Sequence, residues 1–197
     1  MEHYYSTQQK SPLKIKKINQ KIRKQEFEFY TASGVFSKEK IDKGTLILAE
    51  NMIIEKNNKV LDLGCGVGIL GIVAVKLFNA DVVMSDVNKR AVMLAKMNIK
   101  INNIKAEIYQ GSLYEKIKNN DFDVVLSNPP QTAGKEICFK LIEQSNEHLK
   151  NNGNLQLVAR HNKGGKTLSK KMEEVFGNVR VIAKKSGYWV YVSKKNE

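Results

Sequence analysis

The chain is poor in cysteine and histidine, and it carries none of the groupings that mark a metal or disulfide site. Its two cysteines, Cys65 and Cys138, lie far apart and form neither a paired metal-binding motif nor a redox motif. The three histidines form no cluster, so we expect no metal. Both cysteines lie among apolar residues or glycines and are expected to stay reduced, which favours a cytoplasmic protein.

No stretch of the sequence is apolar enough to enter a membrane. The first 25 residues are polar and lysine-rich, without the apolar core of a signal peptide. The longest apolar run, Leu63 to Val75, has 13 residues, four of which are glycine, whereas a membrane-spanning helix needs about 20. We therefore expect a soluble protein, and 197 residues fit a single domain.

Acidic residues are missing from two segments in which basic residues gather. The whole chain has 33 basic and 20 acidic residues and a net charge of +13. Residues 10–24 include seven basic residues, and residues 160–171 include five. Such blocks are typical of proteins that bind polyanions. A nucleic-acid partner is therefore favoured, although a lysine-rich composition that serves solubility is the competing interpretation.

The first 42 residues show local patterns but have no core of their own. Among the lysines of this segment, helical spacing of three apolar residues predicts a short basic helix over residues 12–23: Ile15, Ile18 and Ile22. Phe27 and Phe29 alternate with glutamates, which predicts a strand, and a turn at Ser33-Gly34 predicts a return strand from Val35-Phe36. Residues 1–42 are expected to form an extension packed on a main domain, residues 43–197.

From residue 43 onward, helical and strand patterns alternate. This predicts an α/β fold of the doubly wound Rossmann-like type, with a mostly parallel sheet and helices on both faces. The expected strands cover residues 59–63, 81–85, 106–110, 122–127, 155–159, 179–183 and 188–192. The expected helices cover residues 46–53, 68–78, 89–102, 137–149 (capped by 151–153) and 166–176. Only four residues join the last two strands, so one of them must run antiparallel.

A glycine-rich segment leads from the first of these strands into a helix. Gly66, Gly68 and Gly71 match the G-x-G-x-x-G pattern of dinucleotide-binding loops, and Asp86 follows about 20 residues later. Glycines there let a ligand lie directly against the backbone. Either NAD or S-adenosylmethionine would satisfy this pattern taken alone.

Three features favour S-adenosylmethionine over NAD. Asp62 would repel a pyrophosphate but attract the ammonium group of a methionine moiety. No lysine or arginine lies between Lys59 and Lys76 to bind a pyrophosphate. The third feature, an Asn-Pro-Pro strand end, has no role in hydride transfer.

The other expected contacts of S-adenosylmethionine follow the next strands. Asp86 ends the second strand, where its carboxylate can accept hydrogen bonds from ribose hydroxyls; capping the next helix is the alternative. Ser112 follows the third strand and can accept from an adenine amino group, or it can be a turn serine. The expected cofactor-binding residues are Asp62, Gly64, Cys65, Gly66, Gly68, Asp86, Val87, Ser112, Leu113 and Asn128.

Asn128, Pro129 and Pro130 follow a buried strand and are the expected catalytic residues. Prolines cannot continue a sheet ladder, so the strand stops here with acceptor groups facing outward. The Asn128 side-chain oxygen and the Pro129 carbonyl can each accept one N–H of a planar amino group. Since positive charge develops on that nitrogen during methyl transfer, these dipoles favour the transition state. The segment predicts an N-methyltransferase that acts on an exocyclic amino group.

The chain resembles class I methyltransferases, whose Asp-x-Gly-x-Gly-x-Gly loop matches Asp62, Gly64, Gly66 and Gly68. The Ser127-Asn128-Pro129-Pro130 segment resembles the branch that methylates amino groups. Further matches point to the RsmC-like guanine-N2 methyltransferases of small-subunit ribosomal RNA and their archaeal single-domain relatives: residues 34–37, 42–45, 134, 176–177 and 187–191. The resemblance implies a seven-stranded fold, S-adenosylmethionine as methyl donor and a guanine amino group as target.

The sequence departs from that family in three respects. Gln131 follows the prolines where many relatives carry an aromatic residue that stacks on the base, so Phe36 is the candidate stacking residue. Ser112 stands where many class I enzymes have an acidic residue, and we expect no counterpart of the second domain of bacterial RsmC in these 197 residues. The expected substrate-binding residues are Phe36, Gln131, Lys135, Arg160 and His161.

The expected partner is RNA, most simply small-subunit ribosomal RNA or a ribosomal assembly intermediate. Self-association into a homodimer, or the basic N-terminal segment, is a candidate source of additional RNA contacts. Two other functions remain open. One is methylation of a protein glutamine amide, which also uses Asn-Pro-Pro; the other is a non-catalytic, cofactor-binding RNA assembly factor.

Overall fold

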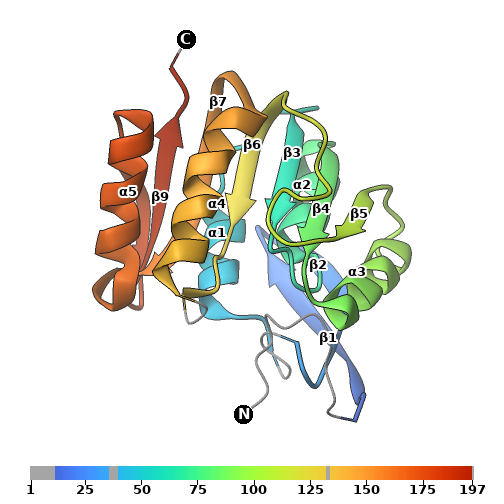
Figure 1. Cartoon of the computed structure of the whole chain (residues 1–197). Coiled ribbons are helices and arrows are strands. Elements are labelled where there is room, and N and C mark those ends of the chain that lie inside the picture. The colour runs from blue at the N-terminus through green and yellow to red at the C-terminus, as the bar shows by residue number, and fades with distance from the viewer. Residues whose placement is uncertain (1–11, 36–39, 132–133, 197) are drawn as a thin grey trace.

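The computed structural model describes residues 12–35, 40–131 and 134–196 and contains a seven-stranded sheet (Figure 1). Its strands are β3 (Lys59–Leu63), β4 (Asp81–Asp86), β5 (Glu107–Gln110), β6 (Phe122–Ser127), β7 (Leu149–Arg160), β8 (Arg180–Lys185) and β9 (Tyr188–Lys194). They lie in the order β5-β4-β3-β6-β7-β9-β8. The strands from β5 to β7 are parallel, and β9 runs antiparallel to both neighbours. The predicted sheet with an antiparallel last strand is confirmed.

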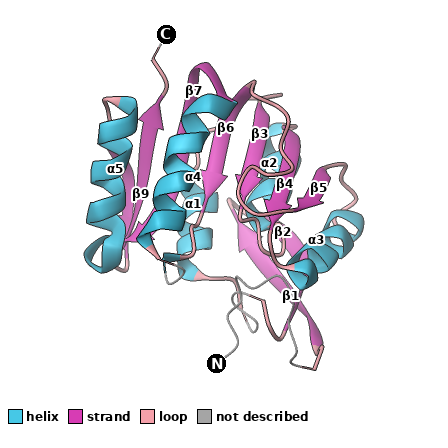
Figure 2. Cartoon of the chain, in the orientation of Figure 1, coloured by secondary structure: helices cyan, strands magenta, loops and turns pink. Residues whose placement is uncertain are grey.

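Helices cover both faces of this sheet (Figure 2). They are α1 (Lys43–Asn51), α2 (Ile69–Phe78), α3 (Lys89–Ile101), α4 (Lys135–His148) and α5 (Lys166–Phe176). The first three share one apolar cluster, to which Val60 of β3 belongs, and the last two share a second with Leu61. Because neighbouring strand residues face opposite ways, β3 fills both cores. Within the described ranges, no helix is long and apolar enough to span a bilayer.

The N-terminal segment is a β-hairpin, and the predicted helix over residues 12–23 is wrong. β1 (Ile15–Ile22) pairs antiparallel with β2 (Gln25–Ala32). Arg23 and Lys24 form the two-residue turn with φ of 47° and 69°, and two positive φ values match the twist of a hairpin. The predicted return strand is also wrong at Val35, which lies in a bend, while Phe36 lies outside the described residues.

One helix end also differs from the prediction. Residues 151–153 do not cap α4, which ends at His148, but belong to β7. After β7, residues His161–Gly165 form a short irregular turn, η2, in which Lys163 and Gly164 have non-helical backbone angles, before α5 begins. The predicted boundary between an extension and a main domain at residue 42 is a proposal, and it coincides with Asp42, the N-cap of α1.

The hairpin is attached to α3 and to the glycine loop through buried asparagine side chains. Asn98 Nδ2 donates to Tyr30 O at 3.0 Å and to Val67 O at 2.9 Å, and Asn98 Oδ1 accepts from Tyr30 N at 2.6 Å. Asn102 Nδ2 donates to Glu28 O at 2.6 Å. Asn98 is fully buried. Its hydrogen bonds hold β2 beside the loop that follows β3.

Replacing Asn98 tests this attachment. Asn98→Ala leaves the Tyr30 and Val67 backbone groups without their partner, and each unsatisfied buried group costs about 1–3 kcal/mol. We expect the free energy of unfolding to fall by about 3 kcal/mol in urea titrations. Exposed Asn120→Ala is the matched control. Equal stability of the two variants would contradict the role assigned to Asn98.

One carboxyl group is buried inside the sheet. Asp62 is 1% exposed, and its Oδ2 accepts from Gly71 N in the first turn of α2 at 2.9 Å. Its Oδ1 is buried and has no hydrogen-bond partner among the described residues. Because burial disfavours the charged form, the pKa of Asp62 is raised to about 7. Asp62 therefore anchors the start of α2 to β3 at a cost in stability when it is ionised.

The raised pKa predicts how stability depends on pH. Between the ordinary pKa of 3.8 and about 7, the folded chain keeps the Asp62 proton while the unfolded chain has lost it. The contribution of this group to stability therefore falls as the pH rises through that window. Asp62→Asn removes the titration, so its stability relative to the parent should increase from pH 4 to pH 7, by up to about 4 kcal/mol. Urea unfolding across this range measures it.

The same substitution at exposed Asp81 is the control for this pH dependence. A stability difference between Asp62→Asn and the parent that stays constant from pH 4 to pH 7 would show that Asp62 is ionised in the folded chain throughout.

Candidate active site

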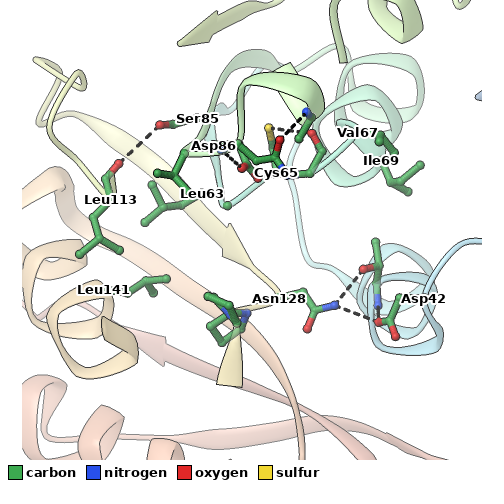
Figure 3. A pocket seen from close by; sticks show the side chains of 18 of the residues that line it. Asp42, Leu63, Cys65, Val67, Ile69, Ser85, Asp86, Leu113, Asn128 and Leu141 are labelled. Atoms are coloured by element: carbon green, nitrogen blue, oxygen red, sulfur yellow. Dashed lines mark hydrogen bonds between the residues drawn. The ribbon is translucent and has the colours of Figure 1, made fainter. Parts of the chain in front are cut away.

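A cleft opens where β3, β4 and β6 end at the same edge of the sheet (Figure 3). In open α/β sheets, ligands bind outside the carboxyl ends of the strands. The walls are largely apolar and come from both cores and the hairpin: Ile18, Ile41, Leu63, Val87, Leu113 and Leu141. Polar side chains enter at a few points only, and they include Asp42, Thr45, Asp86 and Asn128. A few polar groups in an apolar cavity are typical of a small-molecule site.

The glycine loop exposes its backbone to this cleft. Gly64 N and Cys65 N both donate to Ser85 O, at 2.9 and 3.0 Å, and so fix the loop to β4. Gly64 and Gly66 have φ of 70° and 55°, and a Cβ built on either would meet no atom within 4 Å. Both glycines line the cleft. There is therefore room for a ligand to lie directly against the main chain here.

The other two glycines of the predicted motif serve helix packing. Gly68 has φ of 87°, and its Cβ would lie 3.2 Å from Met84 Sδ. A Cβ on Gly71 would lie 2.8 Å from the same sulfur. Neither residue is part of the cleft lining. They let α2 approach β4 closely, and this places the start of α2 beside the loop.

Asp86 lies at the end of β4 with both carboxylate oxygens held. Oδ2 accepts from Gly66 N at 2.7 Å and Oδ1 from Asn88 N at 2.8 Å. Burial raises the pKa of Asp86, and these two hydrogen bonds oppose the rise. The N-cap of α3 is Asn88, which accepts from Arg90 N and Ala91 N. The alternative that Asp86 caps the helix is therefore wrong, and its side chain lines the cleft instead.

The far end of the cleft is formed by the segment after β5. Ser112 and Leu113 both line it, as do Val87 and Cys65. Ser112 is exposed, and its backbone N–H donates to Glu115 Oε2 at 3.2 Å. Burial raises the pKa of the Cys65 thiol well above its ordinary value, so this side chain is neutral. Asp62, in contrast, lies beneath the glycine loop and is not part of the lining.

Asn128 lies across the cleft from the glycine loop, with its amide held by two residues of the α1 start (Figure 3). Asn128 Nδ2 donates to Asp42 Oδ2 and to Thr45 Oγ1, at 2.9 Å each. A carboxylate can only accept hydrogen bonds, so the nitrogen of the amide must face Asp42. No donor from the described residues reaches Asn128 Oδ1. The amide oxygen is therefore left available, beside Pro129 and Pro130, which also line the cleft.

Asp42 is fixed from several sides. Its Oδ2 accepts from Thr45 N at 3.0 Å, as expected of a helix N-cap. A Cβ on Gly44 would lie 2.9 Å from this oxygen and 3.0 Å from the Tyr188 ring, so only glycine fits between them. Burial and then the charge of Asp42 raise the pKa of the Tyr188 phenol. Asp42 thus joins Asn128 at the end of β6 to Tyr188 at the start of β9.

Gln131 connects the proline segment to the end of β7. Its Oε1 accepts from Arg160 N at 3.2 Å, and its Nε2 donates to Lys163 O at 3.0 Å. Both polar ends of the side chain are therefore bound to backbone groups. This fixes the position of Pro130 relative to η2.

The other predicted substrate-binding residues that the structure describes lie outside the cleft lining. Arg160 and His161 end β7 and begin η2, next to Gln131, and His161 Nδ1 lies 2.7 Å from the Tyr191 hydroxyl. Lys135 is exposed at the first position of α4 and is not part of the cleft lining. Phe36, the candidate stacking residue, lies outside the described residues.

The sequence patterns did not identify Asp42 and Thr45 as site residues. The sequence held only a weak signal, since Asp is a common N-cap residue and Asp42 lies shortly before an apolar segment, but no Glu or Gln follows it three residues later. A capping pattern, however, does not show which strand end the helix start faces.

Comparisons with known proteins agree with this geometry. The family model described as the methyltransferase small domain matches residues 26–192. The uncharacterized protein YbxB of Bacillus subtilis strain 168 is 36% identical over 98% of each chain. The ribosomal RNA small subunit methyltransferase C of Haemophilus influenzae strain 86-028NP is 30% identical over 98% of this chain and 59% of its own.

A solved structure has the same fold over nearly the whole chain. It is the 16S rRNA N2 G1207 methyltransferase (RsmC) of T. thermophilus in complex with AdoMet and guanosine, with a TM-score of 0.83 and 23% identity. The match covers 94% of this chain and 52% of that one. The chain thus spans roughly half to three fifths of the length of three relatives named ribosomal RNA small subunit methyltransferase C. Since the family model covers residues 26–192, the chain belongs to the methyltransferase small domain family.

Proposed function

We propose that this protein is an S-adenosylmethionine-dependent N-methyltransferase that acts on guanine N2 of small-subunit ribosomal RNA. The observation that carries the proposal is the orientation of Asn128, whose Nδ2 is bound by Asp42 and Thr45 while its Oδ1 stays available at the cleft. Relatives named ribosomal RNA small subunit methyltransferase C support the substrate class.

The cleft has the features needed to bind S-adenosylmethionine. Gly64 and Gly66 leave open space against the backbone for the methionine portion. Asp86 lines the cleft with a carboxylate that can accept from ribose hydroxyls, and Val87 and Leu113 supply apolar surface for adenine. Ser112 lies at that end, where it can accept from the adenine amino group. We assign Asp62 an indirect role, because it holds Gly71 and thereby the start of α2.

The residues around Asn128 orient the substrate amino group. Asn128 Oδ1 accepts one of its N–H groups. The Pro129 carbonyl already accepts from Gln131 N at 2.8 Å, and its second lone pair accepts the other N–H, which aims the nitrogen lone pair at the methyl donor. When bound, S-adenosylmethionine would supply a methyl group on a sulfonium. The substrate nitrogen would form the N–C bond as the C–S bond breaks, the electron pair would stay on sulfur, and the proton of the nitrogen would pass to water. The Asp42 carboxylate, one hydrogen bond behind Asn128, favours the positive charge that develops on this nitrogen.

RNA is the partner that the charge supports. The net charge of +13 and the basic run after β7 suit a polyanion, and they fit a protein glutamine amide or a non-catalytic assembly role less directly. The substrate can be naked ribosomal RNA or an assembly intermediate, and the protein can bind it as a homodimer. We place this function in the cytoplasm.

A methyl-transfer assay tests the function. Purified protein is incubated with methyl-labelled S-adenosylmethionine and unmodified small-subunit ribosomal RNA, and the RNA is digested to nucleosides. We expect label on guanine N2 and a loss of at least about 100-fold in rate for Asn128→Ala, since oriented hydrogen-bond acceptors of this kind contribute about 3 kcal/mol or more. Label on a protein glutamine, or none on RNA despite S-adenosylmethionine binding, would overturn the proposal.

An exchange of the two side chains tests the role of Asp42. Asn128→Asp alone places two carboxylates about 2.9 Å apart, where they repel and compete for a proton. We expect its rate to fall at least about tenfold, which corresponds to about 1.4 kcal/mol. Adding Asp42→Asn restores an amide donor at position 42 that faces a carboxylate acceptor at position 128. The double variant should therefore regain much of the lost rate.

The control for this exchange pairs Asn128→Asp with Asp81→Asn, which removes the same charge at an exposed position far from the cleft. If this pair recovers as much activity as the exchange, or the exchange recovers none, Asp42 does not act through Asn128.

A further inference from the structure

We propose that the rim of the sheet beyond Asn128 binds the RNA nucleotides next to the target guanosine by stacking and charge. We call this rim the edge platform, and it consists of Arg160, His161, Lys184, Tyr188 and Trp189. The inference rests on the proposed function, because it assigns the substrate contacts of the same site. The platform lies where β7 ends and β9 begins, at the cleft end of the sheet (Figure 1).

The platform is built from cations placed over aromatic rings. The rings of His161 and Trp189 are stacked with centroids 3.4 Å apart and an interplanar angle of 12°. Lys184 Nζ lies 4.1 Å from the Trp189 centroid, and this pair is opposed in the β8–β9 register. On the opposite face of the sheet, Arg160 Cζ lies 5.3 Å from the Tyr188 centroid. Such layers can be extended by a nucleobase, which has a flat π face of its own.

The charge of this rim is not compensated within the described chain. No carboxylate of the described residues forms a salt bridge with any of five basic residues here: Arg160, Lys163, Lys166, Lys184 and Lys185. All five are exposed. Burial and then the charges of Lys166 and Lys184 lower the pKa of His161, so its ring is neutral at pH 7. An anionic backbone laid over the rim would relieve this mutual repulsion.

Hydrogen bonds connect the platform to the proposed catalytic residues. Gln131 binds the backbone of Arg160 and Lys163, and it directly follows Pro130. On the other side, Tyr188 packs beside Asp42, which holds Asn128. Gln131 and Asp42 therefore link the platform to Asn128 from two sides. A nucleotide bound on the rim would lie at a fixed position relative to an amino group at Asn128.

The distances suit neighbouring nucleotides of one strand. Adjacent strands lie about 5 Å apart, so the ends of β7, β9 and β8 lie roughly 5, 10 and 15 Å from the end of β6. These distances correspond to about one to four nucleotides of a single strand stacked at ~3.4 Å. The positive charge would also attract an acidic peptide, but the acidic side chains have no planar rings that could stack on His161 and Trp189. We therefore commit to single-stranded RNA.

Trp189 provides a direct test because it is the only tryptophan of the chain. Its fluorescence is followed during titration with single-stranded RNA of about ten nucleotides containing guanosine, a length within known single-strand site sizes. We expect RNA to quench Trp189. Lys184→Ala and His161→Ala should weaken RNA binding about fivefold or more, and Lys184→Ala should reduce the slope of log affinity against log salt by about 1.

Matched controls separate this surface from general charge. Lys76→Ala removes a lysine that also lies over an aromatic ring, Phe27, at 5.8 Å, but on α2 away from the cleft. It should bind RNA as the parent does, and Lys184→Arg should keep near-parent affinity. S-adenosylmethionine affinity, measured by calorimetry, should be the same for the parent and both platform variants, which shows that the fold and cofactor cleft are intact.

The outcomes distinguish the platform from the proposed function. If ribosomal RNA is methylated and the platform variants bind and react like the parent, the platform is wrong while the function stands. If RNA quenches Trp189 and the variants lose affinity but no base is methylated, the platform stands while the function fails. Quenching by polyglutamate equal to that by RNA of the same charge would overturn base stacking at this site.

Discussion

The arrangement of the cleft depends on one hydrogen bond between side chains 86 positions apart, from Asn128 Nδ2 to Asp42 Oδ2. Because a carboxylate cannot donate, it dictates which end of the amide faces it and which end remains for a substrate. Asp42 is itself fixed by the first turn of α1. The direction of the proposed catalytic acceptor is therefore set by the position at which a helix begins.

The sheet topology makes this contact possible and brings the cofactor loop opposite to it. β3 lies between β4 and β6, so the glycine loop, Asp86 and Asn128 end at one edge. The hairpin takes part as well, because Asn98 holds the backbone of both Tyr30 and Val67. The hairpin thus contributes to the wall of the cleft through Ile18 and Thr31. It is held there by the buried amide of Asn98 together with Ile22, Phe27 and Phe29, which belong to the same apolar cluster as α3.

The sequence predicted the sheet well because its strands are apolar runs that end at distinct turn residues. It failed in the first segment, where Ile15, Ile18 and Ile22 have the spacing of a helix. In β1 only Ile18 and Ile22 share the face that packs on the core, and Ile15 is exposed on the other. The hairpin turn at Arg23-Lys24 carries neither glycine nor asparagine, so no local signal marked it. For the candidate site, residue types predicted Asp86 and Asn128 as cleft residues. They could not predict that Asp62 would be buried beneath the loop, or that Asp42 would face Asn128, since both depend on tertiary packing.

Each of the two basic runs of the sequence comes near the cleft on a different element. Three basic residues of the first run, Lys16, Lys17 and Lys21, lie on β1, whose Ile18 lines the cleft. Lys16 is exposed on the same face of the strand as Ile18. The second run begins at Arg160, which Gln131 ties to the proline segment. The cleft mouth is therefore flanked by positive charge on both sides, although the runs are more than a hundred residues apart in the sequence. Charge on a single side would orient a polyanion away from the cleft, whereas charge on both sides favours a strand that crosses it.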